Sequence, residues 1–524
     1  MSNPALQVYG GDEINAIIID PGSYVTNIGY SGTDCPQTIL PSKYGTYEID
    51  PQSEESTTKT IFNEQPLLFP RSGLEIKPIV ENSVIVDWDR AQEQWEYALK
   101  SELKFDTNKG TPALLTEPIW NPESNRKKSL EVLLEAMEFE ACYLTAAPSA
   151  VSFAMGRPTC LVVDIGHDVT SVSPVIDGMT LSKPSTRNFV AGKYLNHLIK
   201  ENLKPREIVP IFQVLKKKPT FVKRSLSFDV NESIIDFANE RQFFQEFKET
   251  LLHIAPKSLK SFADELQSQS KRSLEAPWGE ELIYDAEQRY SFAEQLFHPL
   301  KESFPEGWPV SKDGVVETWH NDYVPLKRTK PGTSTNTKDK EGTAESTPVP
   351  VATEQEAVGS PSQEPNENGK RPIDPKDEKG EKENHNESNN DQENGNEASS
   401  TPAPSSDGVN GKDNDHVAGI VDLINKTMME ADVDLRATLA HNVVLTGGTS
   451  KIPGLSDRIM YELNKSLPAL KFRMLSSGHL RERQYQAWLG GSILASLGTF
   501  HQLWVGKQEY EEVGADRLLK DRFR

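Results

Sequence analysis

Two short stretches of the chain place an aspartate and a glycine at the end of an apolar run, with the same spacing in both. The first run ends at Asp20, with Gly22 two residues later, and the second ends at Asp164, with Gly166 two residues later. Another run rich in β-branched residues follows each turn, so each stretch is predicted to form a strand, a tight turn and a second strand. Backbone N–H groups, a glycine and a carboxylate in such a turn suit phosphate oxygens and a hydrated metal ion.

The repetition makes this pattern informative. A single Asp-x-Gly turn usually does no more than reverse a strand. Here the Val–Thr pair that follows each glycine matches as well, with Val25 and Thr26 in the first stretch and Val169 and Thr170 in the second. The pattern therefore predicts a duplicated phosphate-binding half, in which two facing hairpins hold a nucleotide from both sides.

A third glycine turn follows an apolar strand in the last part of the chain. The run 442–446 leads into Gly447 and Gly448, whose backbone offers a base or a ribose a flat surface without side chains. A further pair, Gly490 and Gly491, interrupts a helical pattern at a cost of roughly 2 kcal/mol in helix propensity. Tight packing or a ligand is therefore expected at this second pair.

Length and composition restrict the class of protein. The chain has 524 residues and a formal net charge of -21, which allows two or more domains and argues against a general grip on nucleic acid through basic patches. Its three cysteines form neither a metal spacing nor a disulfide framework, which favours a reducing compartment. Residues 1–10 lack an apolar signal-peptide core, and no apolar run approaches the roughly 18 residues of a membrane span. A soluble intracellular protein without a membrane partner is expected.

The segments around the two hairpins alternate between strand and helix. Helical periodicity over 90–103, a strand over 112–117, a helix that begins with a cap and a proline at 121–123, and a helix over 193–203 predict an α/β fold. By contrast, 40–72 shows little periodicity and is rich in Ser, Thr, Glu and Pro. This segment is expected to be an irregular, mobile extension.

Two other parts of the chain are expected to be disordered. Residues 1–13 are polar, and the segment 331–416 contains no Phe, Trp, Tyr, Leu, Met or Cys. The segment carries 19 acidic and 8 basic residues, which account for -11 of the net charge of -21. It cannot bury enough apolar surface to offset its ordering entropy. It is either a partner-binding tail or flexible spacer, or an insertion that a surface loop tolerates.

Several motifs in this order resemble actin and its relatives. The resemblance covers most of the chain outside 331–416 and 47–69, and beside the two hairpins it rests on Leu114-Leu115-Thr116-Glu117, Thr446-Gly447-Gly448-Thr449, the run 488–497 and Lys507-Gln508-Glu509-Tyr510. It implies the actin-like fold of the superfamily that also holds hexokinase and heat-shock ATPases, with two α/β lobes and a nucleotide cleft. The implied lobes are 14–160 for the first, 161–330 and 417–484 for the second, and 485–524 for C-terminal helices that return to the first.

The resemblance also implies a site for ATP and Mg²⁺. The matching residues belong to two phosphate loops, the neighbourhood of the ribose and base, and an adenosine turn. They are Asp20, Gly22 and Ser23 in the first loop, Asp164 and Gly166 in the second, Gly192, Lys248 and Glu249 near the ribose and base, and Gly447 and Gly448 in the turn. The two aspartates are implied to hold the magnesium ion through water.

The departures from the family's pattern cluster on the chemistry of hydrolysis. Asn27 replaces a lysine that contacts phosphate, and Gln484 replaces a lysine beside the base. Ala147 or a neighbour replaces the glutamine that orients the attacking water, and Ser171 replaces the histidine that supports this water. His167 replaces an aspartate, although Asp168 lies next to it. The change at Asn27 weakens one charge-assisted hydrogen bond of roughly 1.5–3 kcal/mol. Because an unpositioned water reacts slowly, the sequence predicts a nucleotide-stabilised structural protein and not an efficient enzyme.

More narrowly, the opening 6–13, the acidic segment and 434–436 resemble a nuclear branch of the family. This resemblance implies a subunit of histone acetyltransferase and chromatin-remodelling complexes that binds a scaffold helix beside actin, with histones or nucleosomes as further partners. Roles in transcription regulation and DNA repair, a nuclear location and no sequence-specific binding of nucleic acid are expected. Two alternatives stay open: an actin-like ATPase or filament former, favoured by Asp20 and Asp164, and a small-molecule kinase of the same superfamily.

Overall fold

A computed structural model describes residues 16–49, 57–105, 110–309, 417–476 and 478–523, together with the backbone of 317–318. The predictions about a flexible extension at 1–13 and a disordered insertion at 331–416 lie outside the described residues. Within these ranges no helix is long and apolar enough to cross a membrane.

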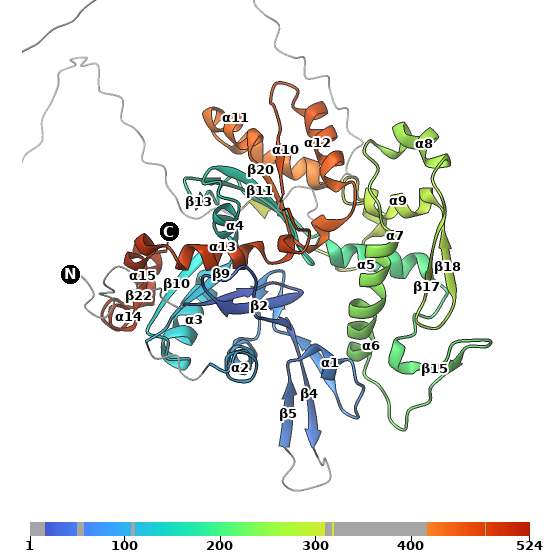
Figure 1. Ribbon diagram of the computed structural model, residues 1–524, viewed down its shortest axis with the longest axis horizontal. Helices are drawn as coiled ribbons and strands as arrows, with labels where there is room; N and C mark the ends of the chain where they lie inside the picture. The colour runs from blue at the N-terminus through green and yellow to red at the C-terminus, as the bar shows by residue number, and fades with distance from the viewer. Residues whose placement is uncertain are drawn as a thin grey trace, which may run out of the picture. The chain divides into compact units, whose positions relative to one another are not determined.

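The first lobe is built on a six-stranded sheet in the order β22-β10-β9-β1-β2-β3 (Figure 1). Its strands are β1 (Ile17–Pro21), β2 (Val25–Tyr30), β3 (Thr38–Pro41), β9 (Pro112–Glu117), β10 (Ala141–Ala146) and β22 (Val505–Gly506). Its helices are α2 (Trp88–Tyr97), α3 (Glu123–Glu131), α4 (Ala147–Ala154), α13 (Gln486–Ala495), α14 (Lys507–Val513) and α15 (Ala515–Asp521). Two apolar clusters cover the two faces of this sheet, which explains why every residue of β9 is buried.

Two details of this lobe differ from the sequence-based expectation. The helix predicted over 90–103 is α2 followed by a π-helical turn, Ala98–Glu102. The cap predicted at 121–123 is wrong: α3 begins at Glu123, and the amide of Asn121 donates to the Glu117 carboxylate at 2.9 Å instead of capping the helix. The strand predicted over 112–117 is confirmed as β9.

The second lobe repeats the plan on a sheet in the order β19-β14-β12-β11-β20-β21, with β13 paired to β12. Its strands are β11 (Cys160–Ile165), β12 (Thr170–Ile176), β13 (Met179–Thr180), β14 (Thr186–Asn188), β19 (Glu317–Thr318), β20 (Val443–Thr446) and β21 (Met474–Leu475). Its helices are α5 (Gly192–Leu203), α10 (Ile420–Glu430), α11 (Val433–His441) and α12 (Leu455–Ser466).

The two predicted hairpins are confirmed, and they have matching registers. In the first, Asp20 lies opposite Asn27 on β2, and in the second, Asp164 lies opposite Ser171 on β12. Each aspartate-bearing strand also has a parallel neighbour, β9 beside β1 and β20 beside β11. The predicted α/β class is therefore confirmed, with the same strand–turn–strand unit at the centre of both sheets.

The prediction of an irregular segment over 40–72 is wrong. This segment holds β4 (Lys43–Ile49), β5 (Thr57–Ile61) and α1 (Glu64–Leu67), and β4 pairs with both β5 and β6 (Glu75–Pro78). The alternation of polar and apolar residues is weak because β5 is largely exposed, although Thr, Tyr and Ile favour strands. A hairpin of β7 (Val80–Glu81) and β8 (Val84–Ile85) follows.

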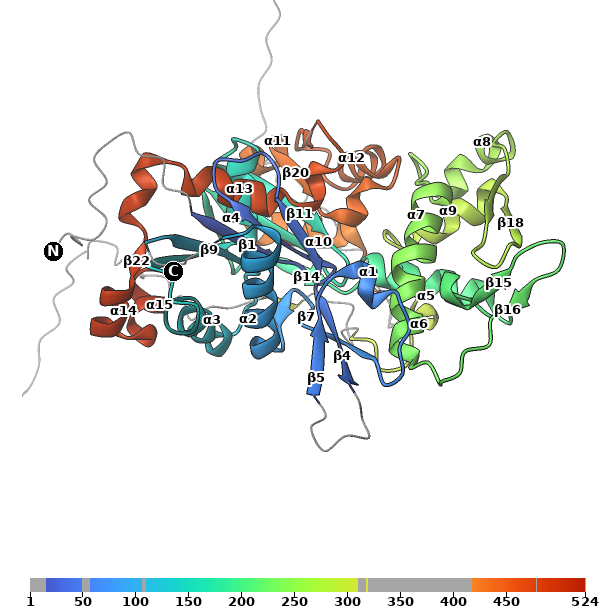
Figure 2. The ribbon, with the colours of Figure 1, turned by 60° about the horizontal axis from the view of Figure 1, so that its bottom comes forward.

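The second lobe carries its own smaller part, which is mainly helical (Figure 2). It contains α6 (Glu232–Ala238), a π-helical turn (Asn239–Phe244), α7 (Gln245–Leu251), α8 (Ala263–Gln267) and α9 (Ala286–Glu294). Two hairpins complete it, β15 (Val214–Lys216) with β16 (Val222–Lys223), and β17 (Arg272–Glu275) with β18 (Glu281–Tyr284).

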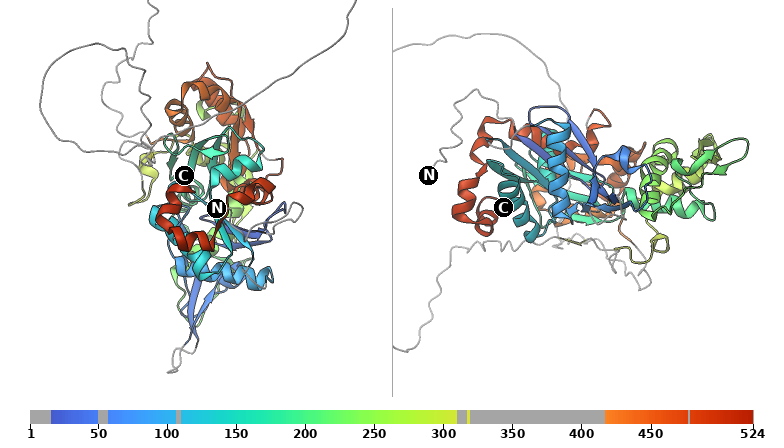
Figure 3. Two further views of the ribbon diagram at one scale, coloured as in Figure 1. Left: turned by 90° about the vertical axis from the view of Figure 1, so that its left-hand side faces the viewer. Right: turned by 90° about the horizontal axis from the view of Figure 1, so that it is seen from below.

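The last part of the chain packs on the first lobe, where β22 pairs with β10 (Figure 3). Helix α13 lies across α4 so closely that a Cβ atom on Gly490 would stand 1.7 Å from the Ala150 carbonyl oxygen. A Cβ atom on Gly491 would meet Ile18 and Leu114 at 3.0 Å. Of the two reasons predicted for this glycine pair, the structure shows tight packing.

Candidate functional site

A cavity of about 470 Å³ lies where the hairpin turns of the two lobes face each other. The predicted site residues that line it are Asp20, Gly22, Ser23, Asp164, Gly166, Lys248, Glu249, Gly447 and Gly448. Gly192 lies behind the lining, because its N–H donates to the Gly166 carbonyl at 3.2 Å. The structure thus brings together residues from three turns that are far apart in the sequence.

The first turn is closed by a backbone hydrogen bond from the Gly22 N–H to the Val25 carbonyl at 3.0 Å. The Asp20 carboxylate accepts from the Thr116 hydroxyl at 2.5 Å and from the Asn27 amide at 3.0 Å. Burial raises the pKa of Asp20, although these two hydrogen bonds act in the opposite direction. Asn27 therefore holds the carboxylate in place and adds no positive charge to the cavity.

The second turn has the same geometry, with the Gly166 N–H donating to the Val169 carbonyl at 2.9 Å. Burial, and next to it the charge of Asp20, raise the pKa of Asp164 to about 7. Two carboxylates that oppose each other's ionisation in a buried cavity suit a divalent cation, which would restore both charged forms. The pair therefore fits a hydrated Mg²⁺, which Asp20 and Asp164 would hold through water. Across the described ranges no group of three or more His, Cys, Asp and Glu side chains forms a separate metal site.

The third turn, at Gly447 and Gly448, packs against the second turn. Gly447 has a φ of +91°, and a Cβ atom there would stand 2.3 Å from the Asp164 carboxylate, so only glycine fits. The Thr449 hydroxyl donates to the Gly166 carbonyl at 2.7 Å. The turn thus presents bare backbone to the cavity beside the second aspartate.

The far side of the cavity is formed by α7 and the residues after β20. Burial lowers the pKa of Lys248 to about 8. The Glu249 carboxylate lies 3.9 Å from the ammonium of Lys451, which also lines the cavity. The side chains of Lys248, Glu249 and Lys451 offer both hydrogen-bond donors and acceptors to a heterocyclic ring of a ligand. The first two turns, in contrast, offer mainly backbone N–H donors.

The residues that depart from the family's pattern all line the same cavity. They are Asn27, Ala147, His167, Ser171 and Gln484. Ala147 is the first residue of α4, and its methyl group can neither donate nor accept a hydrogen bond. Ser171 lies opposite Asp164 on β12, where a hydroxyl has a much shorter reach than an imidazole.

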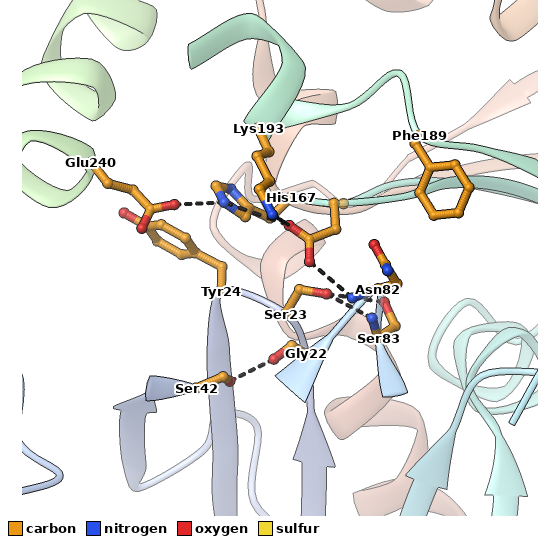
Figure 4. Close-up of polar contacts among 12 residues, drawn as sticks. Gly22, Ser23, Tyr24, Ser42, Asn82, Ser83, His167, Phe189, Lys193 and Glu240 are labelled. Carbon is orange, nitrogen blue, oxygen red and sulfur yellow. Dashed lines mark hydrogen bonds and ion pairs between the residues drawn. The ribbon is translucent and has the colours of Figure 1, made fainter. Parts of the chain in front are cut away.

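Sequence reasoning did not identify a fourth turn at the cavity, the tight turn between β7 and β8. Asn82 and Ser83 both have a positive φ, 51° and 63°, and this turn touches both lobes. The Ser83 N–H donates to the Ser23 hydroxyl at 2.8 Å, and the Asn82 N–H donates to the Asp168 carboxylate at 2.9 Å (Figure 4). The indole of Trp120 donates to the Asn82 carbonyl at 2.9 Å and so helps to fix the turn. An Asn–Ser pair is typical of a turn, but nothing in the sequence indicates which residues this turn contacts.

His167 and Glu240 form a second contact that sequence reasoning missed. The imidazole Nε2 of His167 lies 2.6 Å from the Glu240 carboxylate (Figure 4). Burial by itself would raise the pKa of Glu240, but the contacts with His167 and the Lys43 ammonium outweigh burial and hold it well below its usual range. Glu240 is therefore a fixed negative charge behind the second turn.

Comparison with proteins of known sequence points to the family that the motifs suggested. The sequence model of the family described as Actin matches residues 11–320 and 380–523. A protein of Kluyveromyces lactis named actin-related protein 4 is 81% identical over 525 residues, which span 100% of both chains. Proteins with the same name from Saccharomyces cerevisiae and Schizosaccharomyces pombe are 56% identical over 526 residues and 32% identical over 517 residues. These two alignments cover 100% and 97% of this chain, and the same shares of the relatives.

Proposed function

Because the chain belongs to the actin family, and within it to the group of actin-related protein 4, we propose that it is a structural subunit that holds ATP with Mg²⁺ and does not hydrolyse it efficiently. One observation carries this proposal. The cavity combines two facing phosphate-type turns and an aspartate pair with an alanine and a serine at the positions where water would have to be oriented.

Binding is supported by the fit between the cavity and the ligand. The two turns supply backbone N–H groups, Asp20 and Asp164 would hold the hydrated magnesium ion, and the bare backbone at Gly447 and Gly448 would accept the adenosine. When bound, Mg²⁺ supplies the positive charge that neutralises the aspartates and the phosphates. At a hundred times its dissociation constant such a ligand stabilises the fold by about 2.7 kcal/mol.

Slow hydrolysis is supported by what Ala147 and Ser171 lack. Phosphoryl transfer to water depends on a positioned nucleophile and on charge stabilisation, and much of the rate comes from positioning. A methyl group cannot hold a water molecule, and the Ser171 side chain, on β12 opposite Asp164, is shorter than an imidazole. The bound nucleotide would then act as a structural ligand that fixes one arrangement of the two lobes.

The partners we propose follow from membership of the group. The protein would act in the nucleus as a subunit of histone acetyltransferase and chromatin-remodelling complexes, on a scaffold helix beside actin, and would contribute to transcription regulation and DNA repair. Contact with histones or nucleosomes is supported by the acidic segment 331–416, which carries 19 acidic residues. Affinity purification of the native chain, with identification of co-purifying subunits, tests this part; a chain that purifies alone would contradict it.

Single-turnover hydrolysis of pre-loaded, labelled Mg²⁺–ATP tests the nucleotide role. We expect ATP to co-purify with the protein and to stay intact for hours. Rapid release of phosphate would contradict the proposal and favour the alternative, an actin-like ATPase. Sedimentation with Mg²⁺–ATP and salt addresses the filament-forming version of that alternative, because a polymer would pellet and the proposed subunit would not.

A further inference from the structure

An apolar cluster joins the two lobes beside the phosphate end of the cavity. Helix α1 of the first lobe lies next to α6 of the second in Figures 1 and 2, and strand β6 of the first lobe contacts the same helix. Six side chains, each at most 8% exposed, pack together across this boundary; they are Ile61, Leu67, Leu74 and Ile76 from the first lobe and Ile234 and Phe237 from the second. The side chains of this interface are as buried as those of a domain core, although the interface connects two lobes that could otherwise move apart.

A row of charged contacts continues the apolar cluster toward the cavity. The ammonium of Lys43, on β4, lies 2.5 Å from the Glu240 carboxylate. Arg241 donates to the Tyr24 carbonyl at 2.5 Å, and its guanidinium stacks on the Tyr24 ring at 3.7 Å. The ring of Phe237 links the two layers, because Lys43 and Arg241 both lie over it at 5.7 and 5.4 Å.

The same row reaches the second phosphate turn. Glu240 binds Lys43 of the first lobe with one oxygen and His167 of the second turn with the other, at 2.5 and 2.6 Å. The next residue of the turn, Asp168, accepts from the Asn82 N–H of the first lobe at 2.9 Å. Neighbouring residues of one turn thus connect to the opposite lobe, one through Glu240 and the other directly.

We propose that these contacts form a clasp, consisting of the apolar cluster with Lys43, Glu240, Arg241 and His167, that holds the cavity closed and sets the rate at which a bound nucleotide leaves. The clasp rests on the proposed function, because it concerns a nucleotide in the same cavity. Opening the lobes would expose the apolar cluster to water and would separate the Glu240 carboxylate from a cationic partner. Opening is therefore rare, and His167 and Glu240 are positioning residues that fix the second turn.

The dissociation rate of labelled ATP from the loaded full-length chain, chased with excess unlabelled ATP, tests the clasp. Loss of a charge-assisted contact should speed release roughly tenfold for Lys43→Gln and at least as much for Glu240→Gln. The double variant should release no faster than Glu240→Gln alone, because that change already breaks the pair. Phe237→Leu, which keeps an apolar side chain but loses the ring under both cations, should also speed release.

Lys77→Gln is the matched control. Lys77 lies on β6 of the same small sheet, and its ion pair with Glu75 at 2.8 Å stays within one strand. The Lys77→Gln variant should release ATP at the same rate as the wild type. If Lys43→Gln and Glu240→Gln also release ATP at the wild-type rate, the clasp does not control dissociation and the inference is overturned, while the proposed nucleotide role stands.

Amide hydrogen exchange separates the clasp from the nucleotide. The Ile76 and Asn82 N–H groups donate across the lobe boundary, to the Ser233 hydroxyl at 3.0 Å and to Asp168. In nucleotide-free protein both amides should be protected, and Phe237→Leu but not Lys77→Gln should reduce this protection. Rapid exchange in the free wild type would overturn the clasp. Protected amides in a chain that binds no nucleotide would show that these contacts hold the lobes together, but would refute the proposed function and, with it, control of nucleotide release by the clasp.

Discussion

At the scale of single residues, Asp20 and Asp164 are the most consequential pair. Burial raises the pKa of both, and that of Asp164 reaches about 7. An acid whose pKa is higher in the folded chain than in the unfolded chain binds more protons when folded. Asp164 therefore makes the ligand-free protein less stable as pH rises from about 4 to about 7. A magnesium ion favours the ionised pair and reverses that trend.

Binding of Mg²⁺–ATP should consequently release protons near pH 7, and its affinity should fall as pH drops below 7. Isothermal titration calorimetry in two buffers with different ionisation heats measures the protons released. Asp164→Asn should abolish this release and raise the ligand-free stability at pH 7.5 by on the order of 1 kcal/mol or more. Glu246→Gln, at an exposed site on α7, is the control and should change neither. Binding without proton release at any pH would contradict this assignment.

The missing water-orienting groups lead to a second residue-scale prediction. Ala147→Gln combined with Ser171→His should increase single-turnover hydrolysis at least tenfold, because both side chains reach into the cavity where water must be held. Phosphate release from pre-loaded protein is the measurement. The single substitutions should give smaller increases. A double variant that binds ATP and remains inactive would show that some other feature suppresses the reaction.

The sequence was informative about residues where a pattern repeats or where a motif matches the family, as at Gly447 and Lys248. Asp20 and Asp164 could be paired because the same turn occurs twice with one spacing. Thr116 gave no signal of its own, since its hydroxyl reaches Asp20 only because β9 lies parallel to β1. Asn82 and Glu240 contact residues whose positions depend on how the two lobes meet, which local sequence does not encode.

At the scale of elements, the crossing of α13 over α4 leaves no room for a side chain at Gly490. Gly490→Ala would place a methyl group 1.7 Å from the Ala150 carbonyl oxygen, so α13 would have to move away from α4. The free energy of unfolding should fall by about 3 kcal/mol or more, measured by denaturant titration. Gly498→Ala is the matched control, because nothing lies within 4 Å of its Cβ position. Equal stability of the two variants would contradict this account.

Element prediction succeeded for long or strongly patterned segments and failed for a small sheet. The helix predicted over 193–203 corresponds to α5, and the strand over 112–117 to β9. In contrast, β5 reads Thr-Thr-Lys-Thr-Ile and is largely exposed, so it lacks the alternating apolar face that would have revealed it. Its pairing with β4 supplies what the local pattern lacks.

At the scale of the whole molecule, the acidic segment can be tested separately from the nucleotide cavity. Deleting 331–416 removes -11 of the net charge of -21. Affinity for core histones should fall severalfold at low salt and less at high salt, because the attraction of exposed charges is screened. Fluorescence titration at two salt concentrations measures this, and co-purified ATP is the internal control, which should stay unchanged. Unaltered histone affinity would remove the segment from the proposed role.

The pairing of β22 with β10 has a consequence for how the protein is made. The first lobe begins with β1, but its sheet and the cover over α4 are completed only by α13 and β22, which start at Gln486 and Val505. At typical rates of translation, tens of seconds separate the emergence of α4 from that of α13. Throughout that interval the nascent chain exposes an apolar face of the first sheet. Ribosome-bound chains that end before Gln486 should therefore recruit chaperones, and release from them should coincide with the arrival of the C-terminal helices.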